Sequence, residues 1–226
     1  MSLLFGKHCK DGILFVADGV ARSSGAVGAT PTGKKTLAGI RFGNAYSIAF
    51  AGYAGRDDRK STLDYLKEAA AKEGSLQDNV RDAVWAAYSD AVAHPLTDED
   101  LKDSTEAQRC EAMEPPLITA YISIRSNEWW IASADPGGAN RWLQDTTIAR
   151  ASWPTPEALA GLQPLLIHAP LSIAEATTHF AELFGKTAEM APSHCMYPGV
   201  VCSHRNSGVT MNAFNNSVEL VALGTR

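Results

Sequence analysis

The first 17 residues contain two short apolar segments on either side of Lys10, Asp11 and Gly12. An Asp-Gly pair between apolar segments is a strong signal for a β-hairpin, because both residues tolerate the backbone of a tight turn. The chain is therefore predicted to begin with two antiparallel strands.

Later segments alternate between strand and helix patterns. Residues 34–42 and 44–52 predict a second strand pair joined at Gly43-Asn44, and the apolar spacing after Ser61 predicts two helices separated at Gly74-Ser75. Residues 95–116 are polar and predict an exposed excursion. Residues 117–138 predict two strands joined at Ser126-Asn127, and we expect a second sheet to begin there.

The remainder of the chain repeats this order. Residues 146–153 predict a further strand, residues 156–185 have helical spacing, and residues 199–214 and 218–223 predict the last strands. Strands, helices, strands, helices and strands in this order favour an α+β fold, in which two antiparallel sheets pack face to face between helices. We expect a four-layer αββα sandwich formed by a single domain, residues 1–226.

The composition of the chain argues against some classes of binding partner and favours one cellular compartment. The chain has a net charge of −5 and a pI of about 5.7, and its lysines and arginines are scattered, so no nucleic acid is expected as a partner. No window approaches the roughly 20 apolar residues of a membrane span, so no membrane association is expected. Four widely spaced cysteines argue against a disulfide framework, and a cytoplasmic location is expected.

The order of residues at the start of the chain resembles one known family. Ser2 is followed by Lys-Asp-Gly at residues 10–12 and by Phe-Val-Ala-Asp ending at Asp18. This resembles the proteasome β subunit and the bacterial HslV protease, which belong to the N-terminal-nucleophile hydrolases. Counting back from Asp18 puts Ser2 at the nucleophile of that family. Gly25, Lys34-Lys35 and residues 51–55, Ala-Gly-Tyr-Ala-Gly, are similar to the next family motifs.

The resemblance implies a catalytic set of Ser2, Asp18, Lys35, Gly52 and Ser152. A serine hydroxyl needs a base at neutral pH, and a free α-amine on the same residue can take its proton once Met1 is removed. A lysine ammonium close by favours the anionic hydroxyl, and a carboxylate orients that lysine, roles that fall to Lys35 and Asp18. Alignment from Gly25 selects Lys35, whereas the raw spacing from Asp18 favours Lys34.

Two further positions complete the implied site. The backbone N–H of Gly52 is expected to stabilise the oxyanion of an acyl-transfer reaction. Ser152 occupies the place of the serine in the family's Gly-Ser-Gly loop, although the flanking glycines are absent.

The resemblance implies a peptide or amide-bond hydrolase that acts on a peptide or protein substrate. It implies a homo-oligomeric ring without a cofactor or a metal, and it leaves open an ATP-dependent unfoldase as a partner. Two other functions fit the same fold: a catalytically inactive ring or scaffold subunit, and a small-molecule amidase.

Other motifs suggest competing sites. A zinc site would use a His/Cys cluster, but its spacing fits no standard finger; the cluster is His194, Cys195, Cys202 and His204. A thiol nucleophile at Cys9 beside His8 lacks an orienting third group. Gly33-Lys34-Lys35-Thr36 departs from the phosphate-loop pattern because Lys35 precedes the threonine. Trp129, Trp130, Trp142 and Trp153 could line a binding surface, although core packing is the commoner role of strand aromatics.

Overall fold

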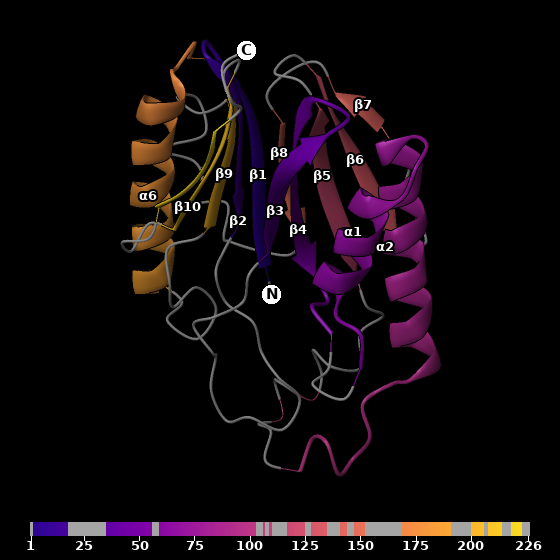
Figure 1. Ribbon diagram of the computed structural model, residues 1–226. Coiled ribbons are helices and arrows are strands. Elements are labelled where there is room, and N and C mark those ends of the chain that lie inside the picture. The colour runs from indigo at the N-terminus through magenta and orange to yellow at the C-terminus, as the bar shows by residue number, and fades with distance from the viewer. Residues whose placement is uncertain are drawn as a thin grey trace.

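The computed structural model describes residues 2–17, 35–55, 59–102, 106, 109, 117–124, 128–134, 141–143, 147–151, 169–190, 200–205, 208–213 and 218–222. In this part of the chain two antiparallel sheets stack face to face, with helices on both outer faces (Figure 1). The α+β sandwich expected from the order of elements is therefore confirmed. None of the described helices is long and apolar enough to cross a membrane.

The first sheet contains six described strands in the order β11-β10-β9-β2-β1-β8. The opening hairpin forms as predicted, because β1 and β2 pair from Leu4↔Ala17 to Cys9↔Gly12. All six residues of β2 are buried, as befits a strand covered on both faces. The strands are β1 (Ser2–Cys9), β2 (Gly12–Ala17), β8 (Thr147–Ala151), β9 (Val200–Arg205), β10 (Gly208–Ala213) and β11 (Val218–Ala222).

The second sheet contains five described strands in the order β3-β4-β5-β6-β7. One expectation is wrong here: β5 pairs with β4, so the strands after residue 117 extend the sheet that β3 and β4 begin, and no new sheet starts there. The short strand β7 was not predicted. The strands are β3 (Thr36–Arg41), β4 (Asn44–Gly52), β5 (Ile118–Ile124), β6 (Glu128–Ala134) and β7 (Arg141–Leu143).

Three described helices cover the outer faces. Helices α1 (Thr62–Ala71) and α2 (Leu76–Ala93) pack on the second sheet through one apolar cluster that includes Ile48 and Phe50, while α6 (Ile173–Met190) covers the first sheet (Figure 1). Phe180 of α6 lies against Phe5 of β1, with ring centroids 5.2 Å apart. The expected break at Gly74-Ser75 separates α1 from α2. The first part of the predicted helical stretch, residues 156–168, and most of residues 103–116 lie outside the described residues.

Serine side chains fix where these helices begin. The Ser61 and Ser75 hydroxyls accept hydrogen bonds from the backbone N–H of Asp64 and Asp78, at 3.1 and 3.3 Å. The Ser172 hydroxyl accepts one from the N–H of Glu175 at 3.2 Å. Such caps satisfy backbone donors that have no partner within the helix. The pattern of a serine three residues before an acid therefore marks each helix start in the sequence.

The core between the sheets brings small residues of β4 together with large aromatic residues of β2 in the facing sheet and of β6 in the same sheet. Ala45, Ala49 and Ala51 lie in one buried cluster with Phe15 of β2 and Trp129 of β6. Gly6 of β1 provides the space for the indole, since a Cβ atom at position 6 would lie 2.5 Å from Trp129 Cη2. Trp129 is fully buried and Trp130 is 7% exposed, so these two tryptophans have the core role that is usual for strand aromatics.

The turn between β3 and β4 is formed by Phe42 and Gly43 and not by Gly43-Asn44. Both turn residues have positive φ, 49° for Phe42 and 73° for Gly43. A tight hairpin turn of this kind favours asparagine or glycine, and the left-handed backbone costs a residue with a Cβ atom about 1–2 kcal/mol. Phe42 is nevertheless found there with 74% of its surface exposed.

Candidate active site at one end of the sandwich

Strand register collects the predicted site positions at one end of the sandwich. In the first sheet, Ser2 at the start of β1 pairs with Ala151 at the end of β8, and Ala17 ends β2 beside Leu4. In the second sheet, Gly52 ends β4 opposite Ile118, the first residue of β5. Figure 1 shows the N-terminus and the end of β4 at the same, lower end of the molecule.

The two sheets are in contact at this end. Leu4 and Ala17 of the first sheet belong to the same buried cluster as Ala49 and Ala51 of the second. The backbone of Ser2 pairs with that of Ala151 two residues before Leu4, so it lies at the end of the sandwich where the two sheets are in contact.

Lys35 lies directly before β3 and is buried, with 1% of its surface exposed. Its carbonyl oxygen accepts a hydrogen bond from the backbone N–H of Phe50 at 2.9 Å, which extends the β3–β4 ladder by one pair. Lysine is among the residues least often found fully buried unless it is paired or functional. Lys34 lies outside the described residues.

The backbone around Gly52 requires glycine. Its φ is 103°, and a Cβ atom at this position would lie 1.7 Å from the Leu117 carbonyl oxygen. That same oxygen accepts a hydrogen bond from the Tyr53 N–H at 2.9 Å. Glycine thus lets the chain leave β4 in close contact with the start of β5. Because glycine has no side chain, nothing at this position shields its own backbone from an approaching molecule.

Sequence reasoning missed a residue that holds this turn in place. The Thr62 hydroxyl donates a hydrogen bond to the Tyr53 carbonyl oxygen at 2.6 Å, and the Thr62 N–H donates one to the Ala54 carbonyl oxygen at 3.0 Å. Thr62 is 1% exposed and is the first residue of α1. The Ser61-x-x-Asp64 capping pattern was the available signal, since it places a helix start directly after the glycine turn.

Two of the predicted residues, Asp18 and Ser152, lie outside the described residues. Each is adjacent to a described strand end at the same end of the first sheet, because Asp18 follows Ala17 and Ser152 follows Ala151. Three of the five positions, Ser2, Lys35 and Gly52, are thus located directly. For the other two, only the neighbouring residue is located.

The competing nucleophile, Cys9, lies at the other end of β1. Its side chain is buried, and burial raises the pKa of the thiol to about 12. A thiol with so high a pKa is protonated at neutral pH and is a poor nucleophile. Lys7, on the same face of β1, is also buried; its Nζ donates a hydrogen bond to the Ala169 carbonyl oxygen at 3.0 Å, and burial lowers its pKa.

The structure also bears on the phosphate-loop and zinc alternatives. Lys35 and Thr36 lead into strand β3, whereas a phosphate-binding loop opens a helix. Half of the proposed zinc site cannot be located, because the described residues include neither His194 nor Cys195.

Comparisons with known proteins bear on the fold. No family model matches the sequence, and a search of curated proteins finds no match. Among solved structures, the Gly-1 mutant of Anbu from Hyphomicrobium sp. strain MC1 has a TM-score of 0.60 at 13% identity, covering 99% of this chain and 88% of that one. The Anbu complex from Pseudomonas aeruginosa has a TM-score of 0.59 at 13% identity over 96% and 88% of the two chains.

A third structure agrees with these two. Anbu from Yersinia bercovieri, described as an ancestral β subunit, has a TM-score of 0.57 at 10% identity over 99% of this chain and 88% of that chain. Identities this low concern the fold alone. The chain therefore shares the fold of these structures, one of which is described as an ancestral β subunit, in agreement with the proteasome-like fold that its first residues implied.

Proposed function

We propose that the chain is a peptide or amide-bond hydrolase of the N-terminal-nucleophile type. Ser2, after removal of Met1, is the nucleophile, and its own α-amine is the general base. Lys35 favours the anionic form of the Ser2 hydroxyl, and Asp18 orients Lys35. The Gly52 N–H stabilises the oxyanion, and Ser152 assists near the nucleophile. Residues 1–226 act as one domain.

The observation that carries this proposal is the strand register at one end of the sandwich. Ser2↔Ala151 and Gly52↔Ile118 bring sequence-distant positions to the same end of the two packed sheets. Lys35, fully buried, is at that end too. An amide hydrolase needs its nucleophile, its activating cation and its oxyanion donor within one small volume, so convergence of these positions supports a site there.

The chemistry follows from the groups themselves. A free α-amine has a pKa of about 7.7–8.0, so much of it is neutral at physiological pH and can accept the hydroxyl proton. Ser2 Oγ attacks the amide carbonyl, a tetrahedral oxyanion forms, and the amine returns the proton to the leaving nitrogen. The resulting ester is hydrolysed by water, which regenerates Ser2.

Assembly and compartment form part of the same proposal. One of the similar structures is described as a helical assembly of the Anbu complex, and the resemblance of the first residues implies a ring, so we infer that this chain forms a homo-oligomer, as a ring or a helical array. A free, buried Cys9 supports a reducing compartment such as the cytoplasm. If the chain forms a ring, an ATP-dependent unfoldase is proposed to deliver the substrate.

The decisive experiment measures covalent reaction at Ser2. Purified protein is analysed by intact mass for loss of Met1 and is then treated with an electrophilic proteasome inhibitor. We expect one adduct in the wild type and in Ser2→Thr, mapped to the N-terminal peptide, and none in Ser2→Ala. Retained Met1, or an adduct that survives in Ser2→Ala, would contradict the proposed nucleophile.

A second comparison decides between the two lysines. Replacing Lys35 by methionine removes the ammonium and keeps a similar side-chain length, so we expect adduct formation to slow by about 10²-fold or more. Lys34→Met is the matched control and is expected to react at close to the wild-type rate. Equal loss in the two variants would contradict the assignment to Lys35. Circular dichroism of both variants separates loss of activity from loss of fold.

Substrate class separates the remaining alternatives. Turnover of an unfolded protein, such as reduced casein, indicates a protease, whereas turnover of small amides alone indicates an amidase. A correctly trimmed chain that assembles but forms no Ser2 adduct would point to an inactive ring or scaffold subunit.

A further inference from the structure

The tip of the β3–β4 hairpin combines backbone strain with an exposed aromatic ring. Phe42 has a φ of 49° and is 74% exposed, in a turn position that favours asparagine or glycine. The Arg41 guanidinium carbon lies 4.8 Å from the centroid of the Phe42 ring, but this contact leaves most of the ring in water. A strained residue that also exposes a large apolar surface is a reasonable place to look for function.

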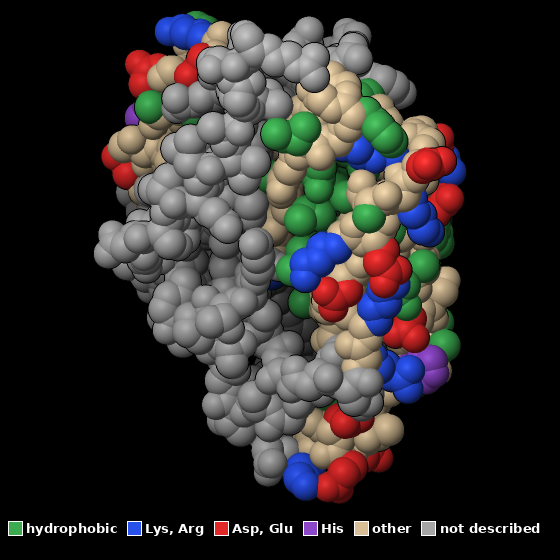
Figure 2. All heavy atoms as spheres, in the orientation of Figure 1, with side chains coloured by type: hydrophobic (Ala, Val, Ile, Leu, Met, Phe, Trp, Pro, Cys, Tyr) green, Lys and Arg blue, Asp and Glu red, His purple; other side chains and the backbone are tan. Residues whose placement is uncertain are grey.

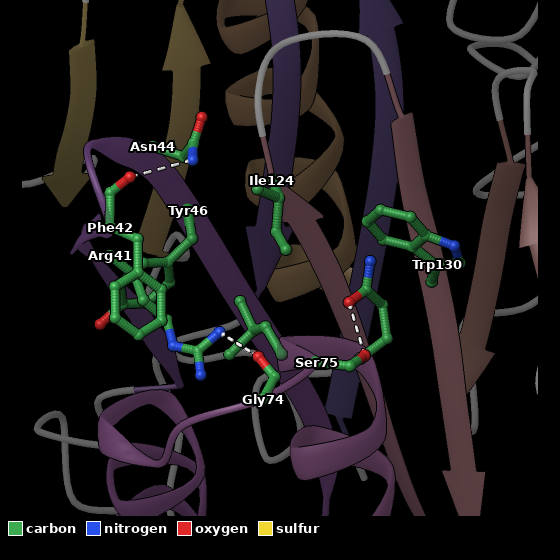
Figure 3. Close-up of a pocket in the computed structure, with 10 residues that line it drawn as sticks. Arg41, Phe42, Asn44, Tyr46, Gly74, Ser75, Ile124 and Trp130 are labelled. Atoms are coloured by element: carbon green, nitrogen blue, oxygen red, sulfur yellow. Dashed lines mark hydrogen bonds between the residues drawn. The ribbon is translucent and has the colours of Figure 1, made fainter.

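A surface pocket of about 370 Å³ lies beside this ring. It is bounded by the hairpin tip, the first turn of α2, and the ends of β5 and β6; Leu76, Ile124 and Trp130 supply its apolar wall (Figure 3). Its volume is near the lower end of the range for small binding pockets, which suits the insertion of one side chain. The pocket is remote from the candidate active site, because Ile124 and Gly52 are at opposite ends of the β4–β5 pair.

Arg41 lines the pocket, and the acidic residue Glu73 directly precedes Gly74 of its lining. Arg41 Nη1 donates a hydrogen bond to the Gly74 carbonyl oxygen at 2.9 Å, and Nη2 donates one to the Lys72 carbonyl oxygen. These bonds hold the guanidinium at the rim without a carboxylate partner among the described residues. Glu73 lies between Lys72 and Gly74, the two residues whose carbonyl oxygens accept these bonds. Its side chain is exposed and likewise has no ion pair within the described part of the chain.

We propose that this surface is a two-fold contact between copies of the chain, in which Phe42 of each copy enters the pocket of the other. A ring and a pocket on the same surface are self-complementary, which is the requirement of a symmetric dimer contact. The Arg41 guanidinium of one copy then faces the Glu73 carboxylate of the other, so charge complementarity reinforces the apolar contact. Buried aromatic residues and arginines are typical anchors of such interfaces. The contact is independent of chemistry at Ser2.

Photo-crosslinking tests the contact directly. A benzophenone amino acid replaces Phe42 in full-length protein, which is mixed with isotopically heavy wild type and irradiated. We expect crosslinked peptides that join light residue 42 to heavy segments containing residues 74–77 or 124–130. Crosslinks only within one chain, or to other segments of the heavy copy, would overturn the proposal. Because the readout is a peptide mass, it does not depend on hydrolase activity.

Sedimentation velocity over a range of concentrations gives a second test. Phe42→Asn removes the ring and suits the left-handed turn, so the fold is expected to keep its thermal midpoint while the dissociation constant of this contact rises at least tenfold. The matched control is Val92→Asn, which changes an exposed apolar residue at the far end of α2 in the same way. This variant is expected to leave the dissociation constant of the contact unchanged. Equal dissociation constants for Phe42→Asn and wild type would contradict the contact, as would equal weakening by Val92→Asn.

Discussion

At the scale of single residues, Gly52 and Gly74 show two different reasons for a glycine. Both have positive φ, 103° and 92°. A Cβ atom at position 74 would have nothing within 4 Å, whereas one at position 52 would overlap the Leu117 carbonyl group. At position 74 only the left-handed backbone conformation favours glycine. At position 52 glycine is required both by the backbone conformation and by the close approach of β5.

Alanine substitution separates these two reasons. Gly74→Ala is expected to lower the free energy of unfolding by about 1–2 kcal/mol, the cost of the left-handed backbone. Gly52→Ala adds the clash with Leu117 and is expected to cost at least about 3 kcal/mol in total. Urea denaturation of the two variants measures both values. Similar losses in the two variants would show that the chain relaxes around position 52.

At the scale of elements, a hydrogen-bonded serine and acid begin helix α1. The Ser61 hydroxyl lies 2.7 Å from Asp64 Oδ2, and Lys67 Nζ lies 3.0 Å from Asp64 Oδ1. The hydrogen bond from Ser61 is the main reason that the pKa of Asp64 lies below its ordinary value of 3.8, with the bond from Lys67 second. The ionised form is thus favoured in the folded chain, and α1 in turn holds the Gly52 turn through Thr62.

This link predicts a pH-dependent contribution from Asp64. A carboxyl whose pKa is lowered by folding stabilises the native state above its unfolded pKa, and that stabilisation is lost as the pH falls through the folded value. Asp64→Asn is therefore expected to be less stable than wild type by about 0.5 kcal/mol at pH 7, since the side chain is half exposed, with the difference shrinking below pH 3.8.

Thermal unfolding between pH 2 and pH 7 checks the effect. Asp98→Asn, the same change in an exposed turn, is the control and should show no such trend. A difference for Asp64→Asn that stays constant down to pH 2 would contradict the role given to the ionised carboxylate.

At the scale of the whole molecule, the two sheets are in close contact where Gly6 faces Trp129. The indole also packs against Phe15 and Tyr121, with ring centroids 5.5 and 4.9 Å away, so it has little room to move. On the outer surface, Figure 2 shows charged side chains of both signs on the α1–α2 side of the molecule, with apolar side chains among them. This contact therefore limits how closely the two sheets can approach one another.

Overpacking at this contact should couple the two residues. Gly6→Ala is expected to destabilise the fold by about 1–3 kcal/mol, because the new methyl group overlaps the indole ring. Trp129→Phe removes the overlapping ring, so the double variant should lose less stability than the sum of the single losses. Chemical denaturation of all four proteins gives the coupling energy. Additive losses would show that the sheets separate without strain at Gly6.

Local signals predicted the elements of this chain well. The turn predicted at Lys10-Asp11-Gly12, the break at Gly74-Ser75 and the strand alternation need only neighbouring residues. The turn and the break have the expected places, with Lys10 and Asp11 between β1 and β2. The position of the β3–β4 turn was predicted one residue too late, because phenylalanine rarely adopts the left-handed conformation that Phe42 has there. The three-residue strand β7 is too short to show a period.

The sequence by itself determined the hairpin at the start of the chain and the break between α1 and α2, because those features depend on residues close together along the chain, and the order of the elements predicted the sandwich class. Only the tertiary structure decided that β5 continues the sheet of β3 and β4, that Cys9 is buried at the opposite end of β1 from Ser2, and that Ser2 and Gly52 share one end of two packed sheets. Pairing between strands far apart in sequence is set by the fit of whole faces in the core, and no local pattern encodes that fit.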